Sequence, residues 1–223
     1  MGRQSSYDDF GAIHFYFLIL CKYFWMSSRL FLDTKKIQII LNRLACQLRE
    51  KHQDFSDSIL IGIQPRGSIL AKRILSILAR EDHLKAIEHG FLDITFFRDD
   101  FRRNEKVLSA NKNLMDVRIE NKKVILIDDV LYTGRSVRAA LTAIDSYGRP
   151  AEIELLTLID RRFSRHLPIQ PDYLGRQVDA ISDEKVRVHW DEEHGEDAVY
   201  IIHKPNEYTK CYALIGNKIF NQL

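Results

Sequence analysis

The sequence predicts one α/β domain in which helices flank a central parallel sheet. Two apolar runs, residues 58–63 and 124–127, lack the polar alternation of a strand exposed on one face, so each indicates a strand buried on both faces. A segment with apolar residues at helical spacing follows each run. Strands that alternate with helices are typical of parallel sheets. The length of 223 residues, 45% of them hydrophobic, suits one domain with a sizeable core.

The charge and cysteine content argue against several classes of protein. Lys and Arg total 33 against 31 Asp and Glu, so the net charge of +2 gives no global signal for a polyanionic partner. Any nucleic-acid surface must therefore be a local patch. Cys21, Cys46 and Cys211 are widely spaced and odd in number, which matches neither a zinc site nor a disulfide framework. A reducing cytoplasm is the location we expect.

The first 25 residues differ from the rest of the chain. Residues 10–25 are largely apolar and aromatic, but His14 and Lys22 interrupt them and the stretch is short for a membrane span. A membrane anchor is the alternative, and Met26 would be a plausible natural start. We expect residues 1–25 to be an extension outside the domain, residues 26–204 to form the domain and residues 205–223 to be a C-terminal tail.

Periodicity and turn residues predict the remaining elements. Asp33 is expected to cap a helix whose first apolar position is Ile37. Residues 160–178 have neither helical nor alternating pattern, and we expect an irregular hood over the strand ends. The other predicted strands are residues 90–97, 152–159, 186–190 and 198–203, with the last two as an antiparallel pair.

The central strand leads into the clearest candidate for a binding site. Asp128 and Asp129 follow residues 124–127, and Thr-Gly-Arg-Ser at residues 133–136 then opens an amphipathic helix. Backbone N–H groups at a helix N-terminus can bind a phosphate, and paired carboxylates can accept hydrogen bonds from sugar hydroxyls. The plain alternative is a buried strand whose acids only cap the next helix. The order and spacing of the motif favour a sugar phosphate.

Two further segments suit a polyphosphate ligand. The strand at residues 58–63 ends in Gln-Pro-Arg-Gly, where Gly67 permits close backbone approach and Arg66 supplies a guanidinium. Residues 98–106 are too charged for a core and too long for a hairpin turn, so a mobile surface loop is expected there. A plain turn and a solvated loop are the alternatives for these two segments.

These segments resemble the type I phosphoribosyltransferases, in which the acid pair holds the ribose hydroxyls and the loop holds the 5′-phosphate. Purine-salvage members carry an Asp where this chain has Tyr132, which makes a purine substrate less favoured. A narrower resemblance, over about residues 29–204, is to the pyrimidine-operon attenuation regulators that are also uracil phosphoribosyltransferases, the PyrR family. It rests on Ile-Gly-Ile-Gln-Pro-Arg-Gly, Leu-Asp-Ile-Thr, Asp-Asp-Val-Leu-Tyr-Thr-Gly-Arg and Leu-Pro-Ile-Gln-Pro-Asp-Tyr-Leu-Gly in this order.

The resemblance implies the type I phosphoribosyltransferase fold and a homodimer or larger oligomer. It also implies uracil and phosphoribosyl pyrophosphate as substrates, UMP and pyrophosphate as products, and Mg²⁺ held mainly by substrate oxygens, with no direct protein ligand assigned. The catalytic residues it implies are Asp128, Asp129 and Arg66. Ribose and 5′-phosphate binding is assigned to Asp128, Asp129, Val130, Leu131, Tyr132, Thr133, Gly134, Arg135 and Ser136. Pyrophosphate binding is assigned to Pro65, Arg66 and Gly67, the flexible loop to Arg98, Asp99, Arg102 and Arg103, and the uracil hood to Gly175, Arg176, Gln177 and Val178.

Two alternative functions remain open at this point. The first is nucleotide-dependent binding of a pyrimidine leader mRNA, for transcription attenuation, either beside the transferase activity or in a regulator with vestigial catalysis. The RNA would contact Arg161, Arg162, Arg165 and Arg176, with His166 in the same basic group. A basic rim around a diphosphate pocket would explain the same residues without RNA. The second alternative is a phosphoribosyltransferase for another nucleobase.

Overall fold

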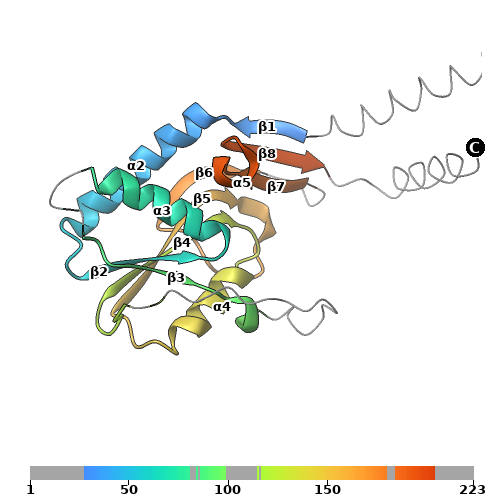
Figure 1. The fold of residues 1–223 in the computed structure, drawn as a ribbon. Coiled ribbons are helices and arrows are strands. Elements are labelled where there is room, and N and C mark those ends of the chain that lie inside the picture. Colours follow the sequence, from blue (N-terminus) through green and yellow to red (C-terminus); the bar gives the residue numbers. More distant parts are fainter. Residues whose placement is uncertain are drawn as a thin grey trace, which may run out of the picture.

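A computed structural model describes residues 28–80, 84, 86–98, 115, 117–179 and 184–203, which form two sheets and their helices (Figure 1). The larger sheet has five strands in the order β3-β2-β4-β5-β6, all parallel, and the smaller has the order β1-β8-β7, antiparallel. The strands are β1 (Ser28–Leu32), β2 (Ser58–Ile63), β3 (His89–Leu92), β4 (Lys123–Leu131), β5 (Glu152–Arg161), β6 (Tyr173–Val178), β7 (Glu184–His189) and β8 (Ala198–His203). The helices are α2 (Thr34–His52), α3 (Arg66–Leu78), α4 (Arg135–Ile144) and α5 (Asp191–His194), with short 3-10 turns η2 (Thr95–Phe97) and η4 (Arg162–Ser164).

The larger sheet is covered on both faces, which explains its apolar strands. Every residue of β2 is buried, as are the first four apolar residues of β4. Helices α2 and α3 pack on one face, in the same core cluster as residues of the small sheet, and α4 packs on the other (Figure 1). The predicted α/β fold with a parallel sheet flanked by helices is therefore confirmed.

The helix boundaries have identifiable causes. The Asp33 side chain caps α2, as predicted, by accepting a hydrogen bond of 2.9 Å from the Lys36 backbone N–H. The apolar stripe of α2, which includes Ile37, Leu41 and Leu44, is buried against the sheet. Helix α4 begins after Gly134, whose φ of 88° is a left-handed conformation that glycine adopts without strain.

Two predicted elements differ from the structure, and one strand was not predicted. The strand predicted over residues 90–97 ends at Leu92, because the Asp93 side chain accepts hydrogen bonds from the N–H and hydroxyl of Thr95 and turns the chain into η2. The stretch predicted to be an irregular hood contains β6, the fifth strand of the larger sheet. Strand β1 was not predicted. It pairs with β8, which lies near the opposite end of the described sequence.

Several predictions concern parts of the chain outside the described residues. They are the extension at residues 1–25, the tail at residues 205–223, and Asp99, Arg102 and Arg103 of the flexible loop. Within the ranges that the structure describes, no helix combines the length and apolar character needed to cross a membrane.

Candidate active site

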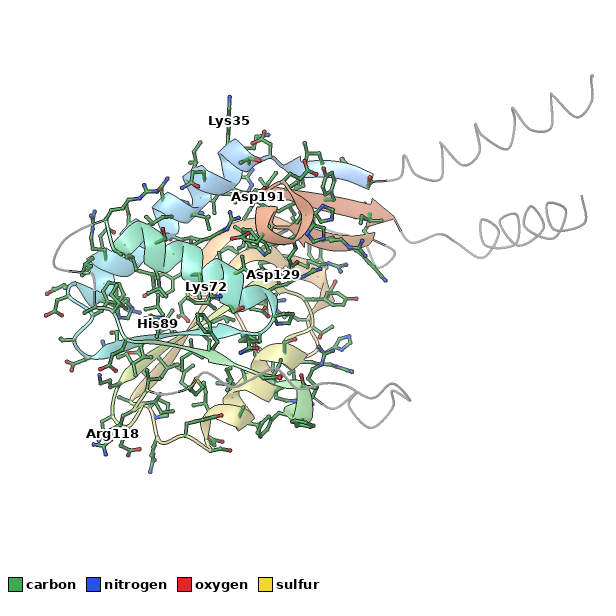
Figure 2. The ribbon with its side chains drawn as sticks, in the orientation of Figure 1. Lys35, Lys72, His89, Arg118, Asp129 and Asp191 are labelled. Carbon is green, nitrogen blue, oxygen red and sulfur yellow. The ribbon has the colours of Figure 1, made fainter. Side chains whose placement is uncertain are left out.

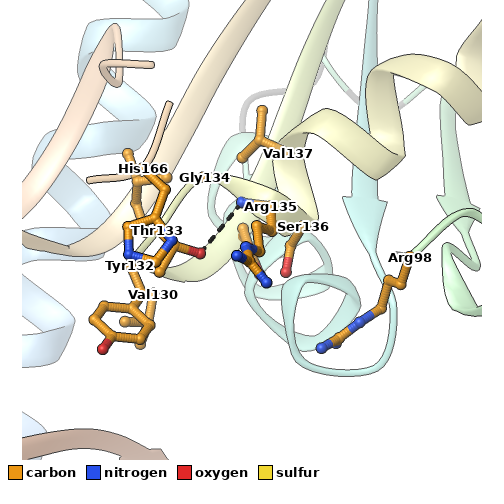
Figure 3. A pocket seen from close by; sticks show the side chains of 11 residues that line it. Arg98, Val130, Tyr132, Thr133, Gly134, Arg135, Ser136, Val137 and His166 are labelled. Carbon is orange, nitrogen blue, oxygen red and sulfur yellow. Dashed lines mark hydrogen bonds between the residues drawn. The ribbon is translucent and has the colours of Figure 1, made fainter. Parts of the chain in front are cut away.

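The last residues of β4 and the turn after them line a pocket at the carboxyl end of the larger sheet (Figure 3). The pocket has a volume of about 340 Å³. Its lining consists of Arg98, Asp128, Val130, Leu131, Tyr132, Thr133, Gly134, Arg135, Ser136, Val137 and His166. Except for Asp129, every residue that the sequence assigned to ribose and 5′-phosphate therefore lines one pocket.

The turn from β4 into α4 is built to receive an anion. The first N–H groups of α4 have no acceptor within the helix and point toward its N-terminal end, beside the hydroxyl groups of Thr133 and Ser136. Thr133 Oγ1 accepts a hydrogen bond of 3.4 Å from the Arg135 backbone N–H (Figure 3). A phosphate here would meet backbone dipoles, hydroxyl groups and the Arg135 side chain together.

The two adjacent acids occupy different environments. Asp128 Oδ1 accepts a hydrogen bond of 3.0 Å from the Asp129 backbone N–H, and its side chain lines the phosphate pocket. Asp129 points to the opposite face of the strand and is 7% exposed. The buried acceptor Asp129 Oδ2 has no hydrogen-bond donor of its own among the described residues.

Burial raises the pKa of both acids. Burial, followed by the charge of Asp129, raises the pKa of Asp128. Burial also raises the pKa of Asp129, to about 6, although the positive charge of Arg66 opposes the change. Raised pKa values in a pocket with a specific charged neighbour are typical of functional sites.

The loop between β2 and α3 lies beside these acids. Arg66 Nη1 is 3.9 Å from Asp129 Oδ2, and the Arg66 side chain is 36% exposed. A Cβ atom on Gly67 would be 2.2 Å from the carbonyl oxygen of Ile127, so only glycine lets this loop pack against β4. The Gln64–Pro65 peptide bond is cis. The predicted pyrophosphate loop and the acid pair thus meet at one edge of the sheet.

Arg98 and Tyr132 also line the phosphate pocket. Arg98, the only flexible-loop candidate within the described residues, lines the phosphate pocket, and its positive charge lowers the pKa of Asp128 against the effect of burial. The Tyr132 ring is covered by the Arg161 guanidinium, whose central carbon lies 4.1 Å from the ring centroid. Arg161 is 4% exposed and donates a hydrogen bond of 2.8 Å to the carbonyl oxygen of Glu184 on β7.

Two of the four arginines predicted to contact RNA are engaged by the protein itself, Arg161 in the interior and Arg165 with 19% of its side chain exposed. Arg161 is buried between Tyr132 and β7. Arg165 donates hydrogen bonds to the carbonyl oxygens of Leu131, Tyr132 and Ile169 and pairs with Asp160. Its guanidinium holds the connection after β5 against the phosphate loop.

The other two arginines are accessible. Arg162 keeps 48% of its side chain exposed and lies 3.1 Å from Asp179, while Arg176 is exposed on β6.

The predicted uracil hood, Gly175 to Val178, is a regular strand with two different surroundings. Gly175 lines a groove with α2, and its carbonyl oxygen accepts a hydrogen bond of 2.6 Å from Arg43. Val178 is buried and pairs with Arg161 at the carboxyl end of the sheet. The irregular hood was therefore predicted wrongly, and only the Val178 end of this stretch adjoins Arg161 and Tyr132.

Sequence reasoning named His166 only among the basic residues that could meet phosphates and did not assign it to the 5′-phosphate loop. His166 lines the phosphate pocket because its backbone N–H donates a hydrogen bond of 3.1 Å to the carbonyl oxygen of Thr133. The signal that could have identified it is the fixed order of the motif and the following Arg-His-Leu-Pro segment, but no local periodicity brings the two together.

Comparison with known proteins agrees with this geometry. Residues 29–196 match the model of the phosphoribosyl transferase domain. The chain belongs to the phosphoribosyltransferase family. Curated relatives of this phosphoribosyltransferase include the "Bifunctional protein PyrR" of Clostridium novyi, 42% identical over 78% of this chain and 96% of the relative, and that of Staphylococcus saprophyticus, 40% identical over 79% and 99%. Relatives at this identity and coverage place the chain in the PyrR family.

Solved structures support the fold of this phosphoribosyltransferase. Hypoxanthine phosphoribosyltransferase from Trypanosoma cruzi superimposes with a TM-score of 0.60 at 15% identity, covering 80% of this chain and 96% of the other. The enzyme of the same name from Staphylococcus aureus gives 0.55 at 22% identity, covering 81% and 94%. At such low identity these likenesses bear on the fold alone.

Proposed function

We propose that this protein transfers the phosphoribosyl group of phosphoribosyl pyrophosphate to uracil, giving UMP and pyrophosphate. The observation that carries the proposal is the buried Asp129 Oδ2, which lacks a hydrogen-bond donor among the described residues and lies 3.9 Å from Arg66. A ribose hydroxyl group at this oxygen would place the 5′-phosphate toward the α4 pocket and the diphosphate toward the β2–α3 loop. The choice of uracil as the acceptor rests on membership of the PyrR family.

The charges that develop during the reaction match these residues. As the bond from ribose C1 to the diphosphate breaks and the bond to the uracil nitrogen forms, positive charge builds on the ribose and negative charge on the leaving group. Asp128 and Asp129 would orient the ribose, and Arg66 with the backbone at Gly67 would stabilise the diphosphate. The transfer needs no covalent nucleophile, and no histidine is assigned as a base.

Magnesium fits this site as a partner of the substrate. No group of three or more His, Cys, Asp or Glu gathers as a metal site within the ranges that the structure describes, so substrate oxygens would supply most of the coordination. When bound, the ion would neutralise part of the charge on the diphosphate. Asp129 and Arg66 would hold the ribose and the diphosphate that carry the ion.

The decisive experiment is a panel of nucleobases with phosphoribosyl pyrophosphate and magnesium. We expect uracil to be the preferred acceptor and UMP to be the product identified by chromatography. Tyr132, which packs against Arg161, stands where the purine-salvage type I phosphoribosyltransferases carry an Asp that faces the purine ring. This difference disfavours hypoxanthine and guanine. Preferential conversion of hypoxanthine would refute the uracil assignment while leaving the transferase assignment intact.

The pH dependence of kcat/KM is expected to show an acid limb set by the coupled pair Asp128 and Asp129, at or above the raised pKa of Asp129, about 6, and not near the ordinary value of 3.8. Asp129 must be ionised to accept the ribose hydroxyls, so the rate should increase as pH rises through this pKa. Glu193→Gln removes a negative charge that also raises the pKa of Asp129, and it should move the limb to lower pH. A limb near 3.8 in the parent protein would contradict the role of buried Asp129.

We also propose regulation by RNA as a second function, for which the accessible Arg162 and Arg176 are the supporting observation. The name of the relatives, "Bifunctional protein PyrR", agrees with two functions. Phosphate contacts would come from these two side chains, whereas Arg161 and Arg165 serve internal hydrogen bonds.

Filter binding to the pyrimidine-gene leader transcript tests this second function. Arg176→Gln should reduce the slope of log affinity against log salt by about one, because one phosphate contact is lost. Arg149→Gln, at the exposed connection before β5, is the matched control and should leave the slope unchanged. UMP should alter the affinity, since coupling between two sites is reciprocal. Binding that ignores both UMP and Arg176 would leave the transferase as the sole function.

A further inference from the structure

Two arginines on the same face of α3 contact different parts of the molecule. Arg66 and Arg73 are two helical turns apart, so their side chains leave α3 in nearly the same direction. Arg66, at the start of the helix, faces Asp129 at 3.9 Å. Arg73 instead reaches the small sheet and α5. The same helix therefore connects the diphosphate loop to the small sheet.

Arg73 makes a dense set of contacts there. Its Nε and Nη2 donate hydrogen bonds of 3.1 and 2.7 Å to the two carboxylate oxygens of Glu192 on α5, and Nη1 donates one of 2.5 Å to Asp197 Oδ2. The guanidinium also lies over the ring of Trp190, 4.8 Å from its centroid, and Trp190 is fully buried. Only 18% of the Arg73 side chain is exposed. This planar, bidentate geometry cannot be reproduced by lysine.

Asp197 extends the connection into the start of α5. Its other oxygen, Oδ1, accepts a hydrogen bond of 2.9 Å from the Asp191 backbone N–H, while Oδ2 binds Arg73. Arg73 is thus linked to α5 through Glu192 within the helix and through Asp197 at its first residue. Figure 2 shows Asp191, Lys72 and Asp129, which mark α5, α3 and the acid pair around this region.

Helix α5 lies close enough to the acid pair to influence it. Glu193, next to Glu192, raises the pKa of Asp129 through its negative charge, in addition to the larger effect of burial. A displacement of α5 would therefore change the electrostatic environment of Asp129 and its neighbour Arg66. The small sheet has two other polar attachments among the hydrogen bonds described, from Thr34 to the Asp197 carbonyl oxygen and from Arg161 to the Glu184 carbonyl oxygen.

We propose that Arg73 is a positioning residue for phosphoribosyl transfer. By binding Glu192 and Asp197 and packing on Trp190, it holds α5 and the small sheet in the position relative to Asp129 and Arg66 that the reaction requires. Arg73 touches no substrate in this scheme and acts only through α5. The proposal rests on the transferase function, and it adds a residue that the sequence motifs did not include.

The test compares Arg73→Lys, Arg73→Met and Lys72→Met. Lysine keeps the charge opposite Glu192 and Asp197, so Arg73→Lys should fold with a melting temperature near that of the parent, but it loses the bidentate grip. We expect its kcat for UMP formation to fall roughly 10-fold to 100-fold, the range that small misplacements cost. Binding of inorganic phosphate, which uses the α4 pocket and not Asp129, should not change. Lys72, exposed on α3 with its amine over Phe91, is the matched control and should behave as the parent.

A purely structural role predicts a different pattern. In that case lysine would restore kcat together with the melting temperature, which would overturn the proposal. Loss of inorganic phosphate binding together with kcat would also overturn it, because the α4 pocket would then be disturbed as well. If Arg73→Met does not fold, Arg73→Lys alone decides between these outcomes.

A spectroscopic measurement keeps this proposal separate from the choice of substrate. In a Trp25→Phe background, Trp190 is the remaining tryptophan, and Arg73→Lys should make it more accessible to acrylamide quenching. Unchanged quenching would show that Arg73 does not hold α5. A parent protein that makes no UMP would refute the proposed function, while the quenching result would still decide whether the grip exists.

Discussion

Replacing Asp129 with asparagine is expected to lower kcat/KM for UMP formation by about 100-fold to 1,000-fold, comparable to removing one key electrostatic group from an active site. The amide group keeps the shape of the carboxylate but cannot accept two strong hydrogen bonds from the ribose, and it removes the negative charge opposite Arg66. Steady-state rates with uracil and phosphoribosyl pyrophosphate measure the effect.

The same substitution should leave the free energy of unfolding unchanged or higher. The raised pKa of Asp129 means that its ionised form is costly in the fold at neutral pH, and asparagine removes that cost. Asp145→Asn, at the exposed end of α4, is the control for an aspartate outside the site. If Asp129→Asn retained the parent activity, the assignment of the ribose site would be wrong.

The second large effect is expected at a buried polar cluster at the amino end of the larger sheet. Glu154 on β5, 1% exposed, accepts a hydrogen bond of 2.6 Å from the Tyr173 hydroxyl group and pairs with Lys51 at 2.8 Å. His52 Nε2 lies 3.1 Å from Glu154 and 2.9 Å from the Tyr173 hydroxyl, while its Nδ1 lies 2.8 Å from Ser58 Oγ. The cluster joins α2, β2, β5 and β6.

Glu154→Ala should lower the free energy of unfolding by about 3–5 kcal/mol, because it leaves the buried His52 and Tyr173 without their common partner. Tyr173→Phe, which removes one hydroxyl group, should cost less, about 1–3 kcal/mol. Urea denaturation measures both values. Equal stability of Glu154→Ala and the parent would show that the cluster contributes nothing to the fold.

The cluster should also make the protein sensitive to acid. Burial lowers the pKa of His52 below 6.5, so the unfolded chain takes up a proton first as pH falls and stability decreases below 6.5. Burial alone would raise the pKa of Glu154, but hydrogen bonds from Lys51 and Tyr173 hold it below 4.5, so its contribution is lost at still lower pH. Urea titrations at a series of pH values should show that His52→Gln loses less stability below pH 6.5 than the parent does. His89→Gln, a change at an exposed histidine, should lose as much stability as the parent.

The sequence predicted the parts of the structure that depend on local pattern. Strand β2 and the cap of α2 were predicted at their observed residues, because uniform burial and a side-chain cap leave local signatures. The meeting of Arg66 with Asp129 follows from parallel strands whose carboxyl ends share one edge. Strand β6 was missed because its exposed Arg176 and Gln177 break the apolar pattern.

Long-range partners could not be predicted in the same way. Nothing in the local sequence distinguishes Arg162, which is half exposed, from Arg161, which is buried over Tyr132. The polar cluster joins His52 to Glu154 and Tyr173, which are 102 and 121 positions away. Strand β1 likewise depends on β8 at the other end of the described chain.

The opposite placement of α3 and α4 has a topological consequence. Strands β2 and β4 are neighbours in the sheet, yet the chain leaves β2 for one face and β4 for the other. The two connections must diverge, and a crevice opens between them at the strand ends, without any side chain being removed to make room. Binding specificity can therefore change through substitutions in the connecting loops while the buried strands beneath them stay the same. Ligand specificity can thus evolve independently of the core.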